Sequence, residues 1–251
     1  MKKILLVFGT RPEAVKMCPL VQELRARREI KSVVCVTGQH REMLDQILAT
    51  FSVVPDYDLS VMKDSQTLFD VTTGVLEGLK GVLEAEKPDI TIALLHWGSE
   101  YNDDISDTQK SIVNLMKKQG VDVIIGTHPH TVQAIEYDAL AGTLVAYSLG
   151  DFFGDASRGG TNYSIILDLE ITKDSSTGTT KVTNYSYTPI YTVSEAESAD
   201  GYRRVVRIDK TVEAWEENYL DKVSQSAKES MVYALDRIEA RINPPVEEKK
   251  K

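Results

Sequence analysis

Three of the four histidines of the chain lie in two short segments, LHWGSEY at residues 95–101 and GTHPH at residues 126–130. Imidazole nitrogens are common ligands of divalent transition metals, and three that converge on one point could hold such an ion. We therefore consider His96, His128 and His130 as candidate ligands of Mn, Fe or Zn. The ordinary alternative is that each is a hydrogen-bonded structural histidine.

The apolar runs before these segments, residues 91–95 and 121–125, predict two strands that are buried on both faces. The segment between them predicts a helix, because Ser106 is a good N-cap with Gln109 three residues later and Gly120 supplies a C-terminal stop. The expected apolar face of this helix consists of Ile112, Leu115 and Met116. A strand, helix and strand of these lengths should form a right-handed unit with parallel strands.

Parallel strands end at the same edge of a sheet, and ligands bind at this edge in open α/β sheets. Pro129 favours an extended backbone at His128, which predicts that His128 and His130 point to the same side. The nearest carboxylates in the sequence are Glu100, Asp151 and Asp155. Because these are few, we expect a single weakly bound metal ion rather than a pair.

The composition limits the class of protein. The 251 residues suffice for one large or two small domains. A net charge of −9 argues against a nucleic-acid partner and leaves small charged metabolites open. The longest apolar runs are strand-sized, and the run at residues 4–8 is too short for a secretory signal. We expect a cytoplasmic protein in which Cys18 and Cys35 are reduced core residues, and the oligomeric state stays open.

The chain begins with an expected strand at residues 3–8, followed by a helix with Thr10 as N-cap and Glu13 closing a capping box. Arg11 and Lys16 lie at the start of this helix. Their charge and the helix dipole could together hold a phosphate, although solvated basic residues are the alternative.

The next segments continue an alternation of strands and helices. The expected elements are a strand at residues 32–37, a helix at 42–51, a connector at 55–63 and a helix at 68–84. In the helix at 42–51 we expect Met43, Ile47 and Leu48 to point inward. This alternation, with the strand at 91–95, predicts a half-domain of the doubly wound type.

Four segments of this first part are distinctive: KILLVFGTRPEA (3–14), VTGQHREMLD (36–45), PDYDL (55–59) and QTLFDVTT (66–73). They closely resemble the non-hydrolysing UDP-N-acetylglucosamine 2-epimerases, over residues 1 to about 90. The resemblance implies a Rossmann-like half-domain in which Arg11 and Lys16 lie near the diphosphate of a nucleotide sugar. It implies a second, regulatory UDP-sugar site at three further residues: Gln39, His40 and Gln66.

The epimerase resemblance ends in mid-domain. The later carboxylates and histidine of that family do not follow, nor does its second Rossmann-like domain. Proton abstraction and elimination of UDP need groups on both sides of the sugar, so half a cleft is insufficient for the isomerase reaction.

The later segments LHWGSEY (95–101), GVDVIIGTHPHTVQ (120–133) and YSLGDF (147–152) resemble a different family. They are similar to the C-terminal part of CapA-type capsule (poly-γ-glutamate) synthesis proteins, over residues from about 89 to 240. This resemblance implies a metallophosphoesterase-like fold with His96, His128 and His130 as metal ligands. Asp151 stands where that family usually has Asn, and the early motifs that supply the other half of a two-metal centre are missing.

After residue 143 the pattern becomes richer in strands. We expect strands at residues 143–148, 162–171 and 181–193, with a hairpin turn at 174–178 joining the last two. The loop at 154–161, which contains Arg158, either lies over the histidine edge or is an ordinary solvated loop. We expect a helix at 212–242 with these core residues: Trp215, Tyr219, Val223, Met231, Leu235 and Ile238.

The sequence thus predicts a layered α/β sandwich. A Rossmann-like parallel half at residues 1–90 is continued by a metallophosphoesterase-like half with antiparallel strands and a C-terminal helix at 91–243, then by a disordered tail at 244–251. Three hypotheses stay open. The chain is a capsule-synthesis protein of CapA type that hydrolyses a phosphoester with a bound metal, a fragment that binds a nucleotide sugar, or a non-catalytic chimera.

Overall fold

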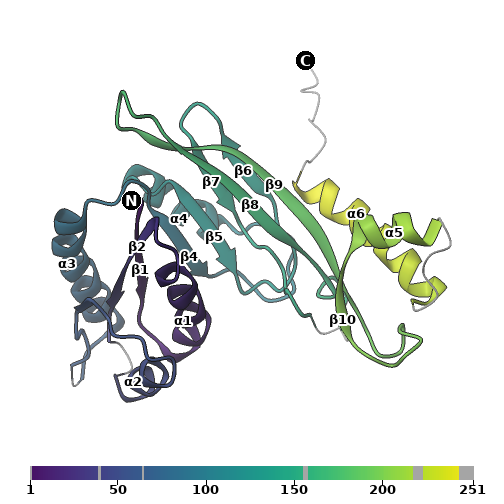
Figure 1. Cartoon of the computed structure of the whole chain (residues 1–251), viewed down its shortest axis with the longest axis horizontal. Helices are drawn as coiled ribbons and strands as arrows, with labels where there is room; N and C mark the ends of the chain where they lie inside the picture. Colours follow the sequence, from purple (N-terminus) through teal and green to yellow (C-terminus); the bar gives the residue numbers. More distant parts are fainter. Residues whose placement is uncertain (1, 39–40, 64, 155–157, 217–222, 243–251) are drawn as a thin grey trace. The chain divides into compact units, whose positions relative to one another are not determined.

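The computed structural model describes residues 2–38, 41–63, 65–154, 158–216 and 223–242. Contacts within the chain define two compact units, residues 1–89 and 90–251. Helices alternate with parallel strands in the first part of the chain, and antiparallel strands dominate later (Figure 1). This arrangement confirms the predicted α/β class.

The first unit contains a three-stranded parallel sheet. Its elements are β1 (Lys2–Phe8), α1 (Arg11–Arg25), β2 (Ile30–Val36), α2 (Arg41–Thr50), β3 (Tyr57–Asp58) and α3 (Leu68–Glu86). The strand order is β1-β2-β3. Two expectations change here: the connector at 55–63 contains a short strand, and the strand at 91–95 belongs to a sheet of the second unit.

The start of α1 follows the predicted capping pattern. The Glu13 carboxylate accepts hydrogen bonds from the backbone N–H groups of Gly9 and Thr10, at 3.0 and 3.1 Å. In α2 the prediction for Met43 is wrong, because Met43 is exposed while Leu44 and Leu48 are buried. Residues four apart lie on the same helix face, so the inward stripe runs one position later than expected.

Glu86, the last residue of α3, binds to two strands of the first unit. Its carboxylate accepts a hydrogen bond of 2.7 Å from the Tyr57 hydroxyl and forms an ion pair of 2.8 Å with Lys3. These bonds hold the pKa of the Glu86 carboxyl below its ordinary value. The end of α3 is therefore attached to β1 and β3 by polar contacts.

The second unit contains a mixed four-stranded sheet and an antiparallel three-stranded sheet. The elements of the first sheet are β4 (Ile92–His96), β5 (Val123–Thr127), β6 (Ile135–Asp138) and β7 (Thr143–Ala146), with α4 (Asp107–Lys118) between β4 and β5. Its order is β4-β5-β7-β6, and β4, β5 and β7 are parallel. The predicted strand, helix and parallel strand are confirmed.

Two burial predictions for β4 and α4 are wrong. The strand at 91–95 is not buried on both faces, because Ile92 and Leu94 of β4 are exposed. Ile92, Leu94 and His96 share one face of β4, and this face is the more exposed of the two. Leu115 of α4 is also exposed, since the inward stripe of the helix runs through Gln109 and Val113.

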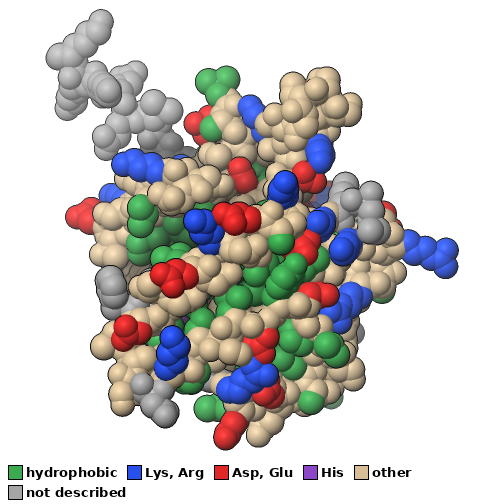
Figure 2. Space-filling model, turned by 90° about the vertical axis from the view of Figure 1, so that its left-hand side faces the viewer, with side chains coloured by type: hydrophobic (Ala, Val, Ile, Leu, Met, Phe, Trp, Pro, Cys, Tyr) green, Lys and Arg blue, Asp and Glu red, His purple; other side chains and the backbone are tan. Residues whose placement is uncertain are grey.

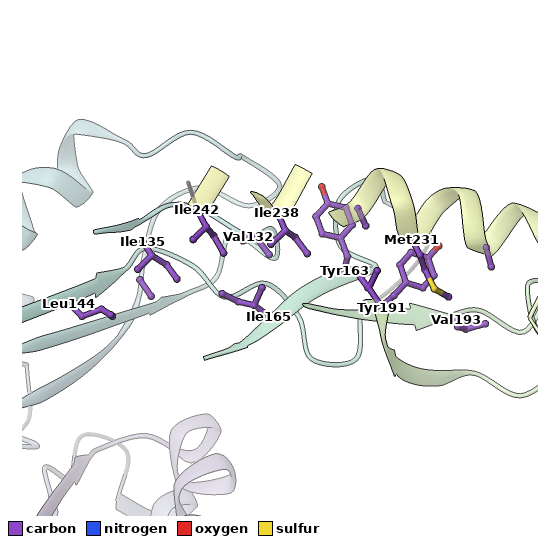
Figure 3. Close-up of a cluster of buried hydrophobic side chains, with 14 of the residues drawn as sticks. Val132, Ile135, Leu144, Tyr163, Ile165, Tyr191, Val193, Met231, Ile238 and Ile242 are labelled. Atoms are coloured by element: carbon purple, nitrogen blue, oxygen red, sulfur yellow. The ribbon is translucent and has the colours of Figure 1, made fainter. Parts of the chain in front are cut away.

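The predicted hairpin is formed by β8 (Tyr163–Lys173) and β9 (Thr180–Val193), and β10 (Arg204–Arg207) extends the sheet on the far side of β9. Helix α6 (Gln225–Ile242) packs its apolar face against these strands and against the four-stranded sheet. Figure 3 shows Met231, Ile238 and Ile242 of α6 among the strand residues of this core.

The predicted single helix at 212–242 is instead two helices, α5 (Ile208–Glu216) and α6. The Ser224 hydroxyl accepts a hydrogen bond from the backbone N–H of Ala227, which begins a new helix. Val223 pairs with Ser198 in a short β-bridge, so its predicted helical position is wrong. Tyr219 and the predicted tail at 244–251 lie outside the described residues.

The surface carries charges of both signs. Figure 2 shows one face on which hydrophobic side chains lie between lysines, arginines and carboxylates. The exposed large hydrophobic residues of the first unit include Val54, Met62 and Leu76. None of the described helices is long and apolar enough to cross a bilayer. Cys18 and Cys35 are buried free thiols, as predicted, and burial raises the pKa of Cys35 to about 11.

Candidate metal centre

The parallel strands of the second unit bring the histidine segments to one sheet edge. His96 is the last residue of β4 and is in register with Thr127, the last residue of β5. His128 therefore follows immediately at the same edge. Because β7 runs parallel to β5, the segment after β7, which contains Asp151, also leaves the sheet on this side.

Glu100, His128 and His130 form a group that could hold a metal ion. One ligand atom of each residue lies within 4.8 Å of the others. The two histidines are half-buried and Glu100 is exposed, so the group has access to solvent. Two imidazole nitrogens and one carboxylate oxygen are a ligand set that suits Zn, Mn or Fe.

His96 lies beside this group without belonging to it. Its ring centroid is 4.4 Å from that of His128, and its Nδ1 is 3.4 Å from the Thr127 hydroxyl. The structure thus brings together all three predicted histidines, while the clustered ligand atoms come from two of them and Glu100. A metal-binding role of His96 stays a prediction.

Asp151 orients His130. Its two carboxylate oxygens lie 2.9 and 3.0 Å from His130 Nδ1. A carboxylate on one ring nitrogen of a histidine leaves the other nitrogen for a metal and fixes the plane of the ring. Asp151 was predicted only as a nearby carboxylate. Its position after a strand parallel to β5 is the signal that places it beside His130.

The backbone at the two histidines is strained. His128 and His130 have φ angles of 100° and 61°, and Tyr101 has 59°. The predicted extended backbone at His128 is therefore wrong. The tertiary structure overrides the local preference for extended backbone before Pro129, whose carbonyl accepts a 2.8 Å hydrogen bond from the Tyr101 backbone N–H. Positive φ at residues other than glycine is uncommon and tends to cluster at functional sites.

Two buried glutamines connect the loop that carries Glu100 to the turn that carries the histidines. Gln109 donates a 3.0 Å hydrogen bond to Gln133, and Gln133 donates to the backbone carbonyls of Asn102 and Asp104. Both glutamine side chains are almost fully buried. This network connects the two loops by hydrogen bonds. The sequence predicted only the capping role of Gln109.

Gly126 and Trp97 pack closely against Tyr147 next to the histidine turn. The indole N–H of Trp97 donates a 2.9 Å hydrogen bond to the Tyr147 carbonyl, and the two rings stack at 5.8 Å. A methyl group at Gly126 would overlap both the Tyr147 carbonyl oxygen and the Trp97 indole nitrogen. The glycine is therefore required by the contact between β5 and its neighbours.

The described candidate nucleotide-sugar residues of the first unit do not form a cluster like that of the metal group. Arg11 and Lys16 are exposed at the start of α1. Gln66 is half-buried and accepts a hydrogen bond from the backbone N–H of Lys63. Gln39 and His40 lie outside the described residues. The predicted nucleotide-sugar contacts stay predictions.

Comparison with known proteins finds both predicted resemblances. A family model described as "Bacterial capsule synthesis protein PGA_cap" matches residues 55–156. A probable UDP-N-acetylglucosamine 2-epimerase of Ralstonia solanacearum is 56% identical over 92 residues, which is 37% of this chain and 24% of that protein. The UDP-N-acetylglucosamine 2-epimerase of Campylobacter jejuni is 56% identical over 91 residues, or 36% of this chain and 24% of that protein.

A crystal structure of UDP-GlcNAc 2-epimerase from Neisseria meningitidis bound to UDP-GlcNAc is also similar. The two chains are 38% identical where they align, and the alignment covers 56% of this chain and 34% of the epimerase chain with a TM-score of 0.37. The chain spans about a quarter of the length of the curated relatives that it matches.

This chain combines features of two kinds of protein. It joins a segment similar to UDP-N-acetylglucosamine 2-epimerases to a segment similar to capsule synthesis proteins. The capsule-type match includes Glu100, His128 and His130, and it ends before the hairpin of β8 and β9.

Proposed function

We propose that the second unit is a metal-dependent phosphoesterase-like hydrolase that acts in the synthesis of a capsule or other cell-surface polymer. The observation that carries this proposal is the clustering of ligand atoms from Glu100, His128 and His130 within 4.8 Å. The PGA_cap match over the same residues supports the biological context.

Each residue of the site has a defined part in this proposal. Glu100, His128 and His130 hold the ion, and Asp151 keeps His130 in the orientation that leaves its second ring nitrogen free. A divalent ion bound there would polarise a phosphoryl oxygen and lower the pKa of a bound water. Mn, Fe and Zn all suit this ligand set.

The test is hydrolysis of bis(p-nitrophenyl) phosphate in the presence of Mn²⁺ or Zn²⁺. The parent should release nitrophenol, whereas the double variant His128→Ala/His130→Ala should fall to the rate of the metal alone. Glu239→Gln, which removes an exposed carboxylate on α6, is the matched control and should keep the parent rate. Equal rates for the parent and the double variant would contradict the proposal. If both equal the rate of the metal alone, they favour a non-catalytic chimera.

A second candidate function, binding of a nucleotide sugar by residues 1–90, is favoured by the 56% identity to epimerases. Arg11 and Lys16 are exposed at the N-terminus of α1, where backbone N–H groups and the helix dipole attract phosphate. Gln39, His40 and Gln66 would contribute the second UDP-sugar site. Binding by residues 1–90 alone should be weak, because this segment matches about a quarter of the length of the epimerase.

Isothermal titration with UDP tests this candidate. Arg11→Ala should weaken binding by about tenfold, the loss expected for one charge-assisted contact. Arg28→Ala removes another exposed arginine of the same unit and should leave binding unchanged. Equal affinity of the parent and Arg11→Ala would exclude Arg11 from any UDP site.

A further inference from the structure

Arg158 lies at the edge of the metal group through an aromatic contact. Its guanidinium carbon is 4.2 Å from the centroid of the Tyr101 ring. The same ring stacks on His130 with a centroid distance of 5.3 Å and an interplanar angle of 19°. Tyr101 follows Glu100 directly in sequence, so Arg158 contacts a residue that adjoins one member of the group and stacks on another.

The described carboxylates leave the charge of Arg158 unpaired. Within the part of the chain that the structure describes, no carboxylate forms an ion pair with Arg158, and its side chain is exposed. Three other arginines of this unit form ion pairs: Arg204 with Asp200, and Arg237 and Arg241 with Asp103. A cation–π contact orients a guanidinium without cancelling its charge.

We propose that Arg158 binds an oxyanionic group of the substrate, a phosphoryl or carboxylate group, beside the ion held by Glu100, His128 and His130. This inference rests on the proposed function and adds the substrate class. A guanidinium presents two parallel N–H donors that match two oxygens of a phosphate or carboxylate, which a lysine ammonium does not. Substrates with a free anionic group next to the scissile bond are therefore preferred.

Tyr101 has a positioning role in this proposal. Its backbone N–H is hydrogen-bonded to the Pro129 carbonyl, so its ring has a fixed place beside the histidine turn. Removal of the ring should free Arg158 to move and weaken anion binding. Removal of the hydroxyl alone should have little effect, because the cation–π contact uses the ring face.

The experiment is titration calorimetry of the full chain with inorganic phosphate and, separately, with glutarate, with and without Mn²⁺. The variants are Arg158→Ala, Arg158→Lys, Tyr101→Leu and Tyr101→Phe, and Arg207→Ala is the matched control for loss of an exposed arginine. A separate Mn²⁺ titration of each variant measures the metal site by itself. Circular dichroism confirms that each variant is folded.

We expect Arg158→Ala to weaken binding of at least one anion by about tenfold or more, with Mn²⁺ affinity unchanged. The anion affinities of Arg158→Lys and Tyr101→Leu should lie between those of Arg158→Ala and the parent. Tyr101→Phe and Arg207→Ala should bind anions as tightly as the parent. The anion that shows the larger loss identifies phosphoryl or carboxylate as the group that is bound.

Equal anion binding by the parent and Arg158→Ala would overturn the inference, as would a parent that binds neither anion. Loss of Mn²⁺ affinity in Arg158→Ala would also overturn it, because Arg158 would then support the metal site. If the parent does not bind Mn²⁺, the proposed function fails. The metal-free titrations still decide whether Arg158 is an anion-binding residue.

Discussion

The two units differ in how their candidate residues are held. In the first unit Arg11 and Lys16 lie exposed on one helix, and their role depends on resemblance to longer proteins. In the second unit Glu100 lies on one loop and His128 and His130 on another, and hydrogen bonds within the unit connect the two loops. The second unit therefore holds its candidate residues in place by its own strand ends and buried glutamines. In the first unit only the sequence motif indicates a site.

The largest effect should come from Gly126→Ala in the second unit. The new methyl group would overlap the Tyr147 carbonyl and Trp97, so we expect a loss of about 3 kcal/mol in the stability of this unit. Hydrogen-exchange mass spectrometry should show faster exchange in residues 90–251. Unchanged exchange there would contradict the packing described at this glycine.

The next effect concerns the glutamine network. Gln133→Leu leaves the Gln109 amide and two backbone carbonyls without their partners, which should cost about 2 kcal/mol. Chemical denaturation measures this loss. Gln46→Leu in α2 changes an exposed glutamine of the other unit and should be nearly neutral. If Gln133→Leu left the free energy of unfolding unchanged, the Gln109–Gln133 network would not be what holds the Glu100 loop to the histidine turn.

Asp151→Asn tests the orientation of His130. An amide is a weaker partner for the imidazole than a carboxylate, so Mn²⁺ or Zn²⁺ affinity should fall by about tenfold. Asp168→Asn, an exposed carboxylate on β8, serves as the control. If Asp151→Asn binds metal as tightly as the parent, the carboxylate has no role in holding His130 for the ion.

The smallest effect should be the acid sensitivity of the first unit. Lys3 and Tyr57 lower the pKa of Glu86, so the ionised carboxylate is favoured in the folded state. Its contribution to stability is present above the unfolded pKa of about 4.3 and is lost as the pH falls through the lower folded pKa. Glu86→Gln should be less stable than the parent at pH 7, and the difference should narrow below about pH 4. A constant difference from pH 7 to 3 would contradict this linkage.

Much of the fold could be predicted from sequence, because capping residues and short apolar runs are local signals. The capping boxes at Thr10 and Ser106 and the hairpin of β8 and β9 were predicted and are present. The errors at Leu94 and Leu115 have a different origin. Their burial depends on which strand or helix lies opposite, and a single sequence does not contain that information.

The candidate site was predictable in its histidines and less so in its other members. Parallel strands necessarily bring His96 and the His128 turn to one edge. Loop conformations place Glu100 in the metal group and Asp151 against His130. These conformations include a positive φ at His128, and the spacing of residues in the sequence does not determine them. Gln133 was not predicted, because a buried polar side chain has no local signature.

The most direct test of a metal site built by the second unit alone is a titration of the metal-free chain with Mn²⁺ and Zn²⁺. The parent should bind one ion per chain. Glu100→Gln, His128→Ala and His130→Ala should each lose most of the affinity, and His96→Ala should retain most of it. No binding by the parent would contradict the account. It would also be contradicted if His96→Ala lost its metal affinity while Glu100→Gln kept the affinity of the parent, since the ion would then be held by three histidines.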